Sequence, residues 1–188
     1  MPPGLSTGVA RVAEDARVGT RLVTIEGARG LAELLRVNRE FLAPWDPVRD
    51  DEFFTVAGQR AVVGAALEQY EQGWCLPWVI TGDDDRVVGR VSLTGIVRGP
   101  LQSCSLGYWV GAADNGRGFA TAAVREIIRA AFVDLGLHRI EASTQLANVG
   151  SQRVLERAGF TRIGVAPEYL SVDGEWKDVV PYQLVSRQ

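Results

Sequence analysis

The sequence predicts an α/β fold, because a strand pattern gives way to a helix pattern across one short glycine-rich loop. Residues 105–110 alternate between two faces, as expected of a strand that is covered on both sides. In residues 121–135, apolar side chains recur three and four positions apart, which is the spacing of one helix face. The loop between them, residues 115–120, contains Gly116 and Gly118. The other elements are assigned around this strand, loop and helix.

The N-terminal part of the chain predicts one weak strand followed by two helices. Residues 1–18 show no sustained period, and we expect a loosely ordered arm there. Residues 20–25 alternate weakly, and a short helix through residues 31–37 follows. The segment 41–47 ends this helix with two prolines, and residues 53–72 show the helical period again.

Three antiparallel strands are expected before the glycine-rich loop. Residues 74–80 and 86–97 are strand-like and are joined by a turn at residues 82–85, and residues 102–110 form the third strand. Pro77 indicates an edge position or a bulge in the first of these strands, because proline has no N–H to donate to a ladder.

The C-terminal part predicts a crossover. After the long helix, residues 140–146 alternate as a strand. A strand, a helix and a strand at this spacing should place residues 140–146 parallel to residues 105–110. A short helix at residues 148–157 and two strands that turn at residues 173–174 complete the chain.

Composition limits the class of protein. A length of 188 residues with 46% hydrophobic residues fits a single domain, residues 1–188. The sequence has no long apolar run and no signal-peptide pattern, so we expect neither a membrane location nor secretion. Cys75 and Cys104 give no disulfide framework, which favours the cytoplasm. With His138 as the single histidine we expect no metal site, and a net charge of −3 with interspersed signs argues against direct nucleic-acid binding.

Two features near the N-terminal helices allow alternative interpretations. Phe41 and Trp45 either pin a loop by burial or form one wall of an acceptor groove. The acidic residues at 46, 50–52 and 83–85 are either solvated loop residues or, if they flank a cleft, a means of attracting a cationic acceptor.

The loop at residues 115–120 is a candidate anion site. Two glycines would let a ligand approach the backbone, and the first amides of the following helix have no intrahelical partners. A pyrophosphate is the anion that fits best, and the alternative is an ordinary tight turn. The loop lacks the Gly-Lys-Ser/Thr of a P-loop and the full Gly-x-Gly-x-x-Gly of a dinucleotide site.

A series of motifs in this region resembles a known family. Asn115-x-x-Gly118-x-Ala120 resembles the Gln/Arg-x-x-Gly-x-Gly/Ala signature of the GNAT N-acetyltransferase superfamily. Further segments are similar to its RimJ/RimL branch and follow in the same order: Gly107-Tyr108-Trp109-Val110, Asn148-x-x-Ser151, residues 155–160, Glu168-Tyr169-Leu170 and residues 174–178. The match spans roughly residues 79–185, and the ordered series is much more specific than any single motif.

The resemblance implies a fold and a cofactor. The fold would be the GNAT fold, a mixed, mostly antiparallel sheet with one parallel, splayed strand pair, flanked by helices. The cosubstrate would be acetyl-coenzyme A (acetyl-CoA), with no metal. The implied cofactor-binding residues are Trp109, Val110, Asn115, Gly116, Arg117, Gly118, Phe119, Ala120, Thr121, Asn148 and Ser151.

The implied reaction, aminolysis of a thioester, needs a neutral amine and a stabilised oxyanion. The resemblance assigns the general base to Glu168, whose alternative role is that of a surface residue beside a strand. Glu141 is a second candidate base, although a charged residue on an alternating strand more often faces solvent or an ion-pair partner. We expect the oxyanion to meet a backbone N–H near Val110.

The departing thiolate should gain a proton. Ser151 matches the family serine that contacts the sulfur, and Asn148 would hold the pantetheine amides. The alternative is that residues 148–151 are simply a helix cap and first turn. Many superfamily members have a tyrosine four residues after this serine, whereas this sequence has Leu155 there.

The resemblance implies acetylation of an α-amine, at the N-terminus of a ribosomal protein or another peptide. One alternative is a small amine, such as an antibiotic, a polyamine or an aminoacyl nucleotide, and another is a CoA-binding module without catalysis. An open groove would favour a peptide, whereas a closed pocket lined by Trp45, Trp74 or Trp176 would favour a small molecule. Whether the chain forms a homodimer is left open.

Overall fold

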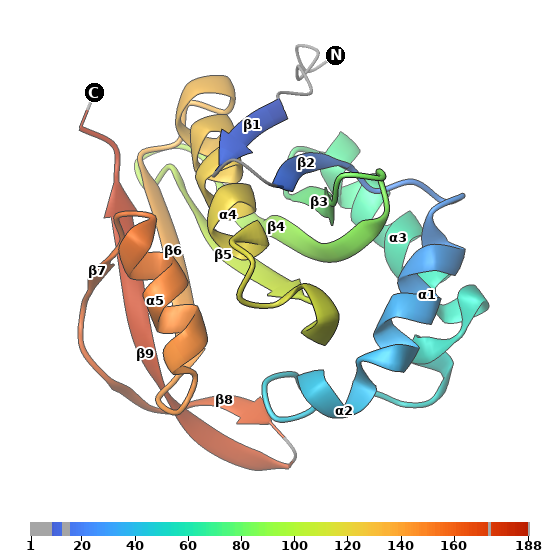
Figure 1. The fold of residues 1–188 in the computed structure, drawn as a ribbon. Helices are drawn as coiled ribbons and strands as arrows, with labels where there is room; N and C mark the ends of the chain where they lie inside the picture. The colour runs from blue at the N-terminus through green and yellow to red at the C-terminus, as the bar shows by residue number, and fades with distance from the viewer. Residues whose placement is uncertain (1–8, 13–15, 173, 188) are drawn as a thin grey trace.

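The computed structural model describes residues 9–12, 16–172 and 174–187 (Figure 1). Within these residues one sheet contains nine strands in the order β1-β2-β3-β4-β5-β6-β9-β7, and β8 also pairs with β9. The strands are β1 (Val9–Val12), β2 (Ala16–Leu22), β3 (Leu76–Thr81), β4 (Val87–Val97), β5 (Ser103–Val110), β6 (Arg139–Gln145), β7 (Thr161–Arg162), β8 (Ala166–Val172) and β9 (Glu175–Val185).

The helices follow the predicted order along the chain. They are α1 (Ala28–Val37), α2 (Arg39–Leu42), α3 (Val56–Glu71), α4 (Phe119–Arg129) and α5 (Val149–Arg157), with 3-10 turns η1 (Glu52–Phe54) and η2 (Ala112–Asp114) and a π-helical turn η3 (Ala130–Asp134). In the described residues no helix is long and apolar enough to cross a membrane.

The parallel strand pair β5 and β6 is splayed. The two strands pair only where residues 103–105 lie beside residues 139–141. Beyond that point β5 stays paired with β4 as far as Val110, and β6 stays paired with β9 as far as Gln145. The predicted crossover is therefore confirmed, and the two strands separate toward their C-terminal ends.

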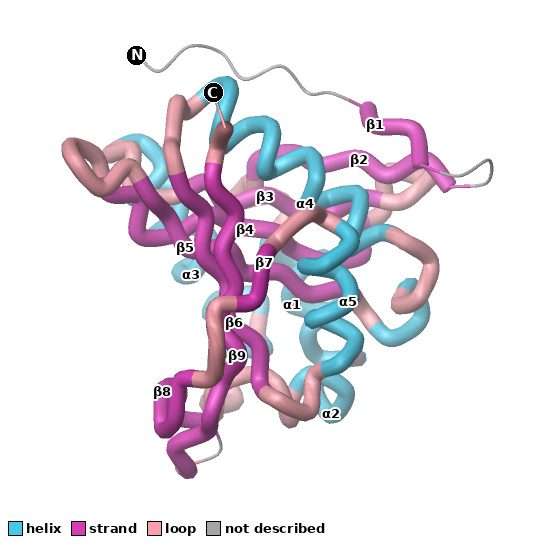
Figure 2. Tube along the Cα trace, turned by 90° about the vertical axis from the view of Figure 1, so that its left-hand side faces the viewer, coloured by secondary structure: helices cyan, strands magenta, loops and turns pink. Residues whose placement is uncertain are grey.

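Both faces of the sheet are covered, as β3 makes clear. Every residue of β3 is buried. Trp78 and Ile80 belong to the large core that includes buried residues of α4, whereas Val79 between them packs with Leu31 of α1 and Val63 of α3. Figure 2 shows α4 and α5 side by side along one face of the sheet. The helices α1 and α3 cover the opposite face.

The structure corrects two expectations. Within the predicted loose arm at residues 1–18, residues 9–12 pair with the start of β2, so that part of the arm is strand; residues 1–8 and 13–15 lie outside the described residues. Pro77 is not at an edge, because β3 lies between β2 and β4, and the irregularity in its pairing with β4 falls at Ile80 and Thr81. The carbonyl of Pro77 accepts from Val23 N at 3.0 Å where the β2 ladder ends, so the missing N–H interrupts nothing further.

Candidate active site

A cleft of about 930 Å³ lies where β5 and β6 separate. Residues 106–110 of β5 and residues 142–145 of β6 line it. These are the parts of the two strands that do not pair with each other. The divergence of the strands thus opens a cleft in the middle of the sheet.

The cleft has two sides, which we name by the helices that form them. The α4–α5 side comprises its lining residues within 114–121 and 147–157. The α1–α3 side comprises its lining residues within 35–62, together with Arg90 and Ser92 of β4. One cavity therefore connects the two faces of the sheet.

Backbone amides are exposed at the start of α4. Gly118 precedes the helix with φ +88°, and no side chain caps it. The first intrahelical bond runs from Ala122 N to Gly118 O at 3.0 Å, so the amides of residues 119–121 have no helical partner. A Cβ placed at Gly116 or Gly118 would meet no atom within 4 Å, which means that the space beside this turn is open. The positive end of the helix dipole and these free donors favour an anion here.

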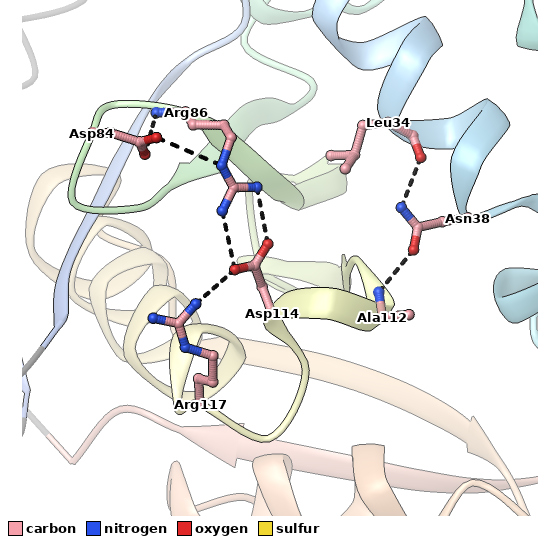
Figure 3. A network of polar contacts seen from close by, with 7 residues as sticks. All are labelled: Leu34, Asn38, Asp84, Arg86, Ala112, Asp114 and Arg117. Atoms are coloured by element: carbon pink, nitrogen blue, oxygen red, sulfur yellow. Dashed lines mark hydrogen bonds and ion pairs between the residues drawn. The ribbon is translucent and has the colours of Figure 1, made fainter.

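A buried carboxylate holds the loop before α4 in place (Figure 3). Asp114 in η2 is 3% exposed. Arg86 donates to both of its oxygens, at 3.0 and 3.2 Å, and Arg117 donates to one at 2.9 Å. The loop is thereby linked to Arg86, the residue just before β4. The Arg117 guanidinium also lies 5.2 Å from the centroid of the Phe119 ring, so Arg117 contacts residues on both sides of the turn.

A second link joins the loop to the α1–α3 side. Asn38, at the end of α1, is 5% exposed. Its Nδ2 donates to Leu34 O at 2.8 Å, and its Oδ1 accepts from Ala112 N at 2.7 Å (Figure 3). This side chain spans from α1 to η2 and fixes the distance between the two sides of the cleft.

The predicted cofactor-binding residues gather in this cleft. All of them except Arg117 line it. Arg153 and Arg157 of α5 also line the α4–α5 side and add positive charge, although the sequence analysis did not single them out. Their spacing of four residues on a helix was the available signal. The binding roles themselves stay predictions.

Ser151 meets a tyrosine that the sequence analysis did not assign. The Tyr108 hydroxyl of β5 lies 2.7 Å from Ser151 Oγ and donates to Ser151 O at 3.0 Å. Burial raises the pKa of Tyr108 to about 12, so the phenol stays protonated at neutral pH. Leu155 is fully buried. The only earlier signal for Tyr108 was its place in the segment Gly107-Tyr108-Trp109-Val110.

Asn148 and Thr144 complete this part of the cleft. Asn148 caps α5, with its Oδ1 accepting from Ser151 N at 3.0 Å. The capping alternative is therefore correct for the side-chain oxygen of Asn148. Thr144 of β6 is 5% exposed, and its Oγ1 has no hydrogen-bond partner in the described part of the chain. A buried hydroxyl without a partner is costly.

Glu168 lies on β8, two residues before Leu170. It is exposed and has φ +48°, within the stretch of β8 where the pairing with β9 shifts register. Its backbone N–H donates to Asp178 Oδ1 at 2.9 Å. Its side chain does not line the cleft, but Leu170 and Val179, on the same two strands, do. Such a backbone conformation is uncommon for a glutamate and often occurs at functional sites.

The other candidate base is less suitable. Glu141 on β6 has a side chain that is 54% exposed, 3.8 Å from Arg139. It does not line the cleft. The interpretation of Glu141 as a solvent-facing, ion-paired residue therefore fits the structure better than a catalytic one.

The α1–α3 side contains aromatic and charged side chains from the segment after α1. Trp45 and Asp46 line it. Burial raises the pKa of Asp46, and the charge of Arg49 opposes this rise. The neighbouring acidic residues are already engaged, because Asp50 caps Phe53 N at 3.0 Å and Asp51 pairs with Arg39 at 2.8 Å.

The acidic turn at residues 83–85 does not reach the cleft. Both cysteines are buried and free, and burial raises the pKa of Cys104 to about 12. These thiols are therefore poor nucleophiles. Within the described residues no group of three or more His, Cys, Asp or Glu side chains could hold a metal ion.

Comparison with known proteins defines the class to which this fold and cleft belong. The family described as "Acetyltransferase (GNAT) domain" matches residues 17–161. The chain belongs to the GNAT acetyltransferase family, and the predicted fold class is confirmed.

Individual relatives narrow this class. Probable N-acetyltransferase YjcK of Bacillus subtilis is 42% identical over 142 residues, which cover 75% of this chain and 78% of that protein. The ribosomal protein uS5 alanine N-acetyltransferase of Escherichia coli is 34% identical over 165 residues, covering 87% and 85%. The structure of Mycobacterium smegmatis RimJ in complex with CoA-disulfide matches with a TM-score of 0.87 at 31% identity, covering 90% of this chain and 82% of that chain. The chain is thus an N-acetyltransferase of the RimJ/RimL type.

Proposed function

We propose that the chain uses acetyl-CoA to acetylate the N-terminal α-amine of a ribosomal protein, and so acts in the cytoplasm. The main support is the cleft itself, which carries free amides and basic side chains on its α4–α5 side and opens through the sheet to the α1–α3 side. A cofactor on one side and an acceptor on the other would meet between the separated strands.

The α4–α5 side fits the chemical groups of coenzyme A. The uncapped turn at Gly118 offers amides to a pyrophosphate, with Arg153 and Arg157 nearby as counter-charges. The side-chain amide of Asn148 is suited to hydrogen-bond a pantetheine amide. When bound, acetyl-CoA supplies the acetyl thioester. The M. smegmatis relative, solved with CoA-disulfide, supports this assignment.

Three side chains are assigned to the chemical step, as base, as positioning residue and as donor to the sulfur. Glu168 would act as the general base, directly or through one water, because an N-terminal amine with a pKa of about 7.7 to 8.0 needs only a modest base. The protonated phenol of Tyr108 can hold the Ser151 hydroxyl in place, 2.7 Å away. Ser151 would then donate a hydrogen bond to the departing thiolate, and the proton that Glu168 takes from the amine would return to this thiolate through water.

The acceptor is inferred from the relatives and from the shape of the cleft. The E. coli relative is named as an acetyltransferase of ribosomal protein uS5 alanine. Of the three tryptophans considered, only Trp45 lines the cleft, whereas Trp74 and Trp176 are 58% and 65% exposed. An acceptor side that is not closed by all three favours a peptide over a small amine.

A peptide assay tests this proposal. The purified chain, supplied with acetyl-CoA, should acetylate a subset of peptides in an N-terminal library, read by mass spectrometry. Glu168→Gln should lower kcat about 100-fold or more and flatten the rise of rate with pH, because the base is lost. CoA affinity, measured by calorimetry, should not change.

The matched control is Glu175→Gln. Glu175 is exposed on the neighbouring strand β9, where it pairs with Lys177. Its variant should keep a kcat within about two-fold of the parent, as expected for an exposed pair. Turnover of small amines but of no peptide would transfer the assignment to the small-amine alternative.

A further inference from the structure

Arg90 of β4 is a half-buried cation in the cleft. It lies opposite Val79 on β3 and opposite Trp109 on β5, so the three side chains share one face of the sheet. Val79 packs with α1 and α3 residues, which assigns Arg90 to the same face. Because Arg90 lines the cavity, its guanidinium borders the α1–α3 side.

The Arg90 guanidinium has no hydrogen bond or ion pair with any described residue. None of the guanidinium nitrogens is among the fully buried polar atoms that lack a hydrogen-bond partner. They are therefore accessible from the cavity. Burial lowers the pKa of Arg90, yet an arginine stays charged at neutral pH. A cation in this position is costly without an anion to face.

The groups around Arg90 do not supply that anion. The titratable group that acts on the pKa of Arg90 is Cys75, whose thiol donates to Ala66 O at 3.2 Å and whose own pKa is raised by burial, so it is neutral. Asp46 lines the same side, but the charge it interacts with is that of Arg49. The α1–α3 side therefore has one carboxylate and two guanidinium groups.

We propose that Arg90 binds an oxyanion, either a carboxylate or a phosphate, that the acceptor carries close to its reacting amine. This inference rests on the proposed role of the α1–α3 side as the acceptor site. The planar fork of arginine suits both groups through paired hydrogen bonds. Trp109 lies opposite Arg90, and its neighbours Tyr108 and Val110 belong to the proposed site of acetyl transfer. The oxyanion should therefore lie within the first few residues of an acceptor peptide.

The acidic segments of the sequence suggest a cationic acceptor, whereas the unpaired Arg90 predicts an acidic one. Asp50 and Asp51 are engaged locally, and the residues that reach the cavity leave positive charge unpaired. The enzyme should select acidic rather than basic N-termini.

The test uses the full chain and peptides that begin with alanine and differ only at position 2 or 3. A glutamate is compared with glutamine, and a phosphoserine with serine, which separates the carboxylate from the phosphate. We expect KM to be about 10- to 100-fold lower for the acidic member of at least one pair, as a charge-assisted hydrogen bond predicts. Calorimetry with the CoA-loaded protein should give the same ratio in Kd.

Variants assign this preference to Arg90. Arg90→Gln should reduce the ratio of KM values to about one, and Arg90→Lys should give an intermediate ratio, because lysine keeps the charge but loses the fork. Arg60→Gln, on the exposed surface of α3, is the matched control and should keep the full ratio.

Each outcome decides the inference. Equal KM values for acidic and neutral peptides would overturn it, while the turnover itself would still support the proposed function. If no peptide is acetylated, the proposed function fails, and the Kd ratio alone supports or overturns the anion site. If Arg90→Gln does not fold, the wild-type ratio and the Arg90→Lys variant remain decisive.

Discussion

The α4–α5 side of the cleft offers backbone amides, whereas the α1–α3 side offers unpaired side chains. The amides at Gly118 are presented by one tight turn and the start of one helix. The charges of Asp46 and Arg90 come from segments far apart in the sequence and meet only in the folded cavity. A backbone site of this kind serves a cofactor of fixed chemistry, and a side-chain site can be altered for each acceptor.

The two sides also differ in how firmly they are held. The loop before α4 is tied through Asp114 to two arginines. On the other side, the side chains of Asp46 and Arg90 have no hydrogen bonds to described residues. The α4–α5 side should thus be rigid before binding, and the α1–α3 side should gain its partners from a ligand.

Asp114→Asn disrupts the ion-pair network that holds the loop on the α4–α5 side, and it should have the largest effect on stability. Two guanidinium groups lose their shared buried carboxylate, so we expect a loss of about 2 to 3 kcal/mol in the free energy of unfolding. CoA should bind about ten-fold more weakly, because the loop is released. Urea unfolding and calorimetry measure the two effects.

The control for this change is Asp85→Asn. Its carboxylate is 78% exposed and lies 3.8 Å from Arg21, so its loss should cost less than about 0.5 kcal/mol. An Asp114→Asn variant that is as stable as this control would mean that the network does not hold the loop.

Gly118→Ala tests the turn itself. At φ +88° an alanine is strained, and we expect a loss of about 1 kcal/mol together with weaker CoA binding. Gly30→Ala in α1, where an added Cβ meets nothing and φ is not positive, should instead gain about 0.5 to 1 kcal/mol without affecting CoA. Thermal unfolding should show a lower melting temperature for Gly118→Ala and a higher one for Gly30→Ala. Changes of the same sign in both variants would contradict the role given to the positive φ of Gly118.

Tyr108→Phe should cost about 1 kcal/mol of stability at pH 8, less than Asp114→Asn, since it removes a hydroxyl that contacts Ser151. The folded protein raises the pKa of Tyr108 from 10 to about 12. Its contribution to stability is therefore complete below pH 10 and declines as the pH rises from 10 through 12. The stability difference between parent and variant, measured by urea unfolding, should narrow between pH 8 and pH 11; a constant difference would contradict the assignment.

Much of the fold was predictable because its signals are local. The strand at residues 105–110, the turn at Gly118 and the following helix each depend on neighbouring residues alone, and the crossover rule then fixed the parallel strand pair. Pro77 was misjudged because a proline at the end of one ladder resembles a proline at the edge of a sheet.

The sequence by itself determined the turn and helix start on the α4–α5 side, since the periods, the glycines and the ordered motifs around Gly118 specify them whatever surrounds them. Only the tertiary structure decided which side chains meet across the cleft. Tyr108 reaches Ser151 from a strand 43 positions away, and Arg90 is left without a carboxylate by the way α1, α3 and β4 pack. Such contacts depend on strand register and burial, which have no local signature in the chain.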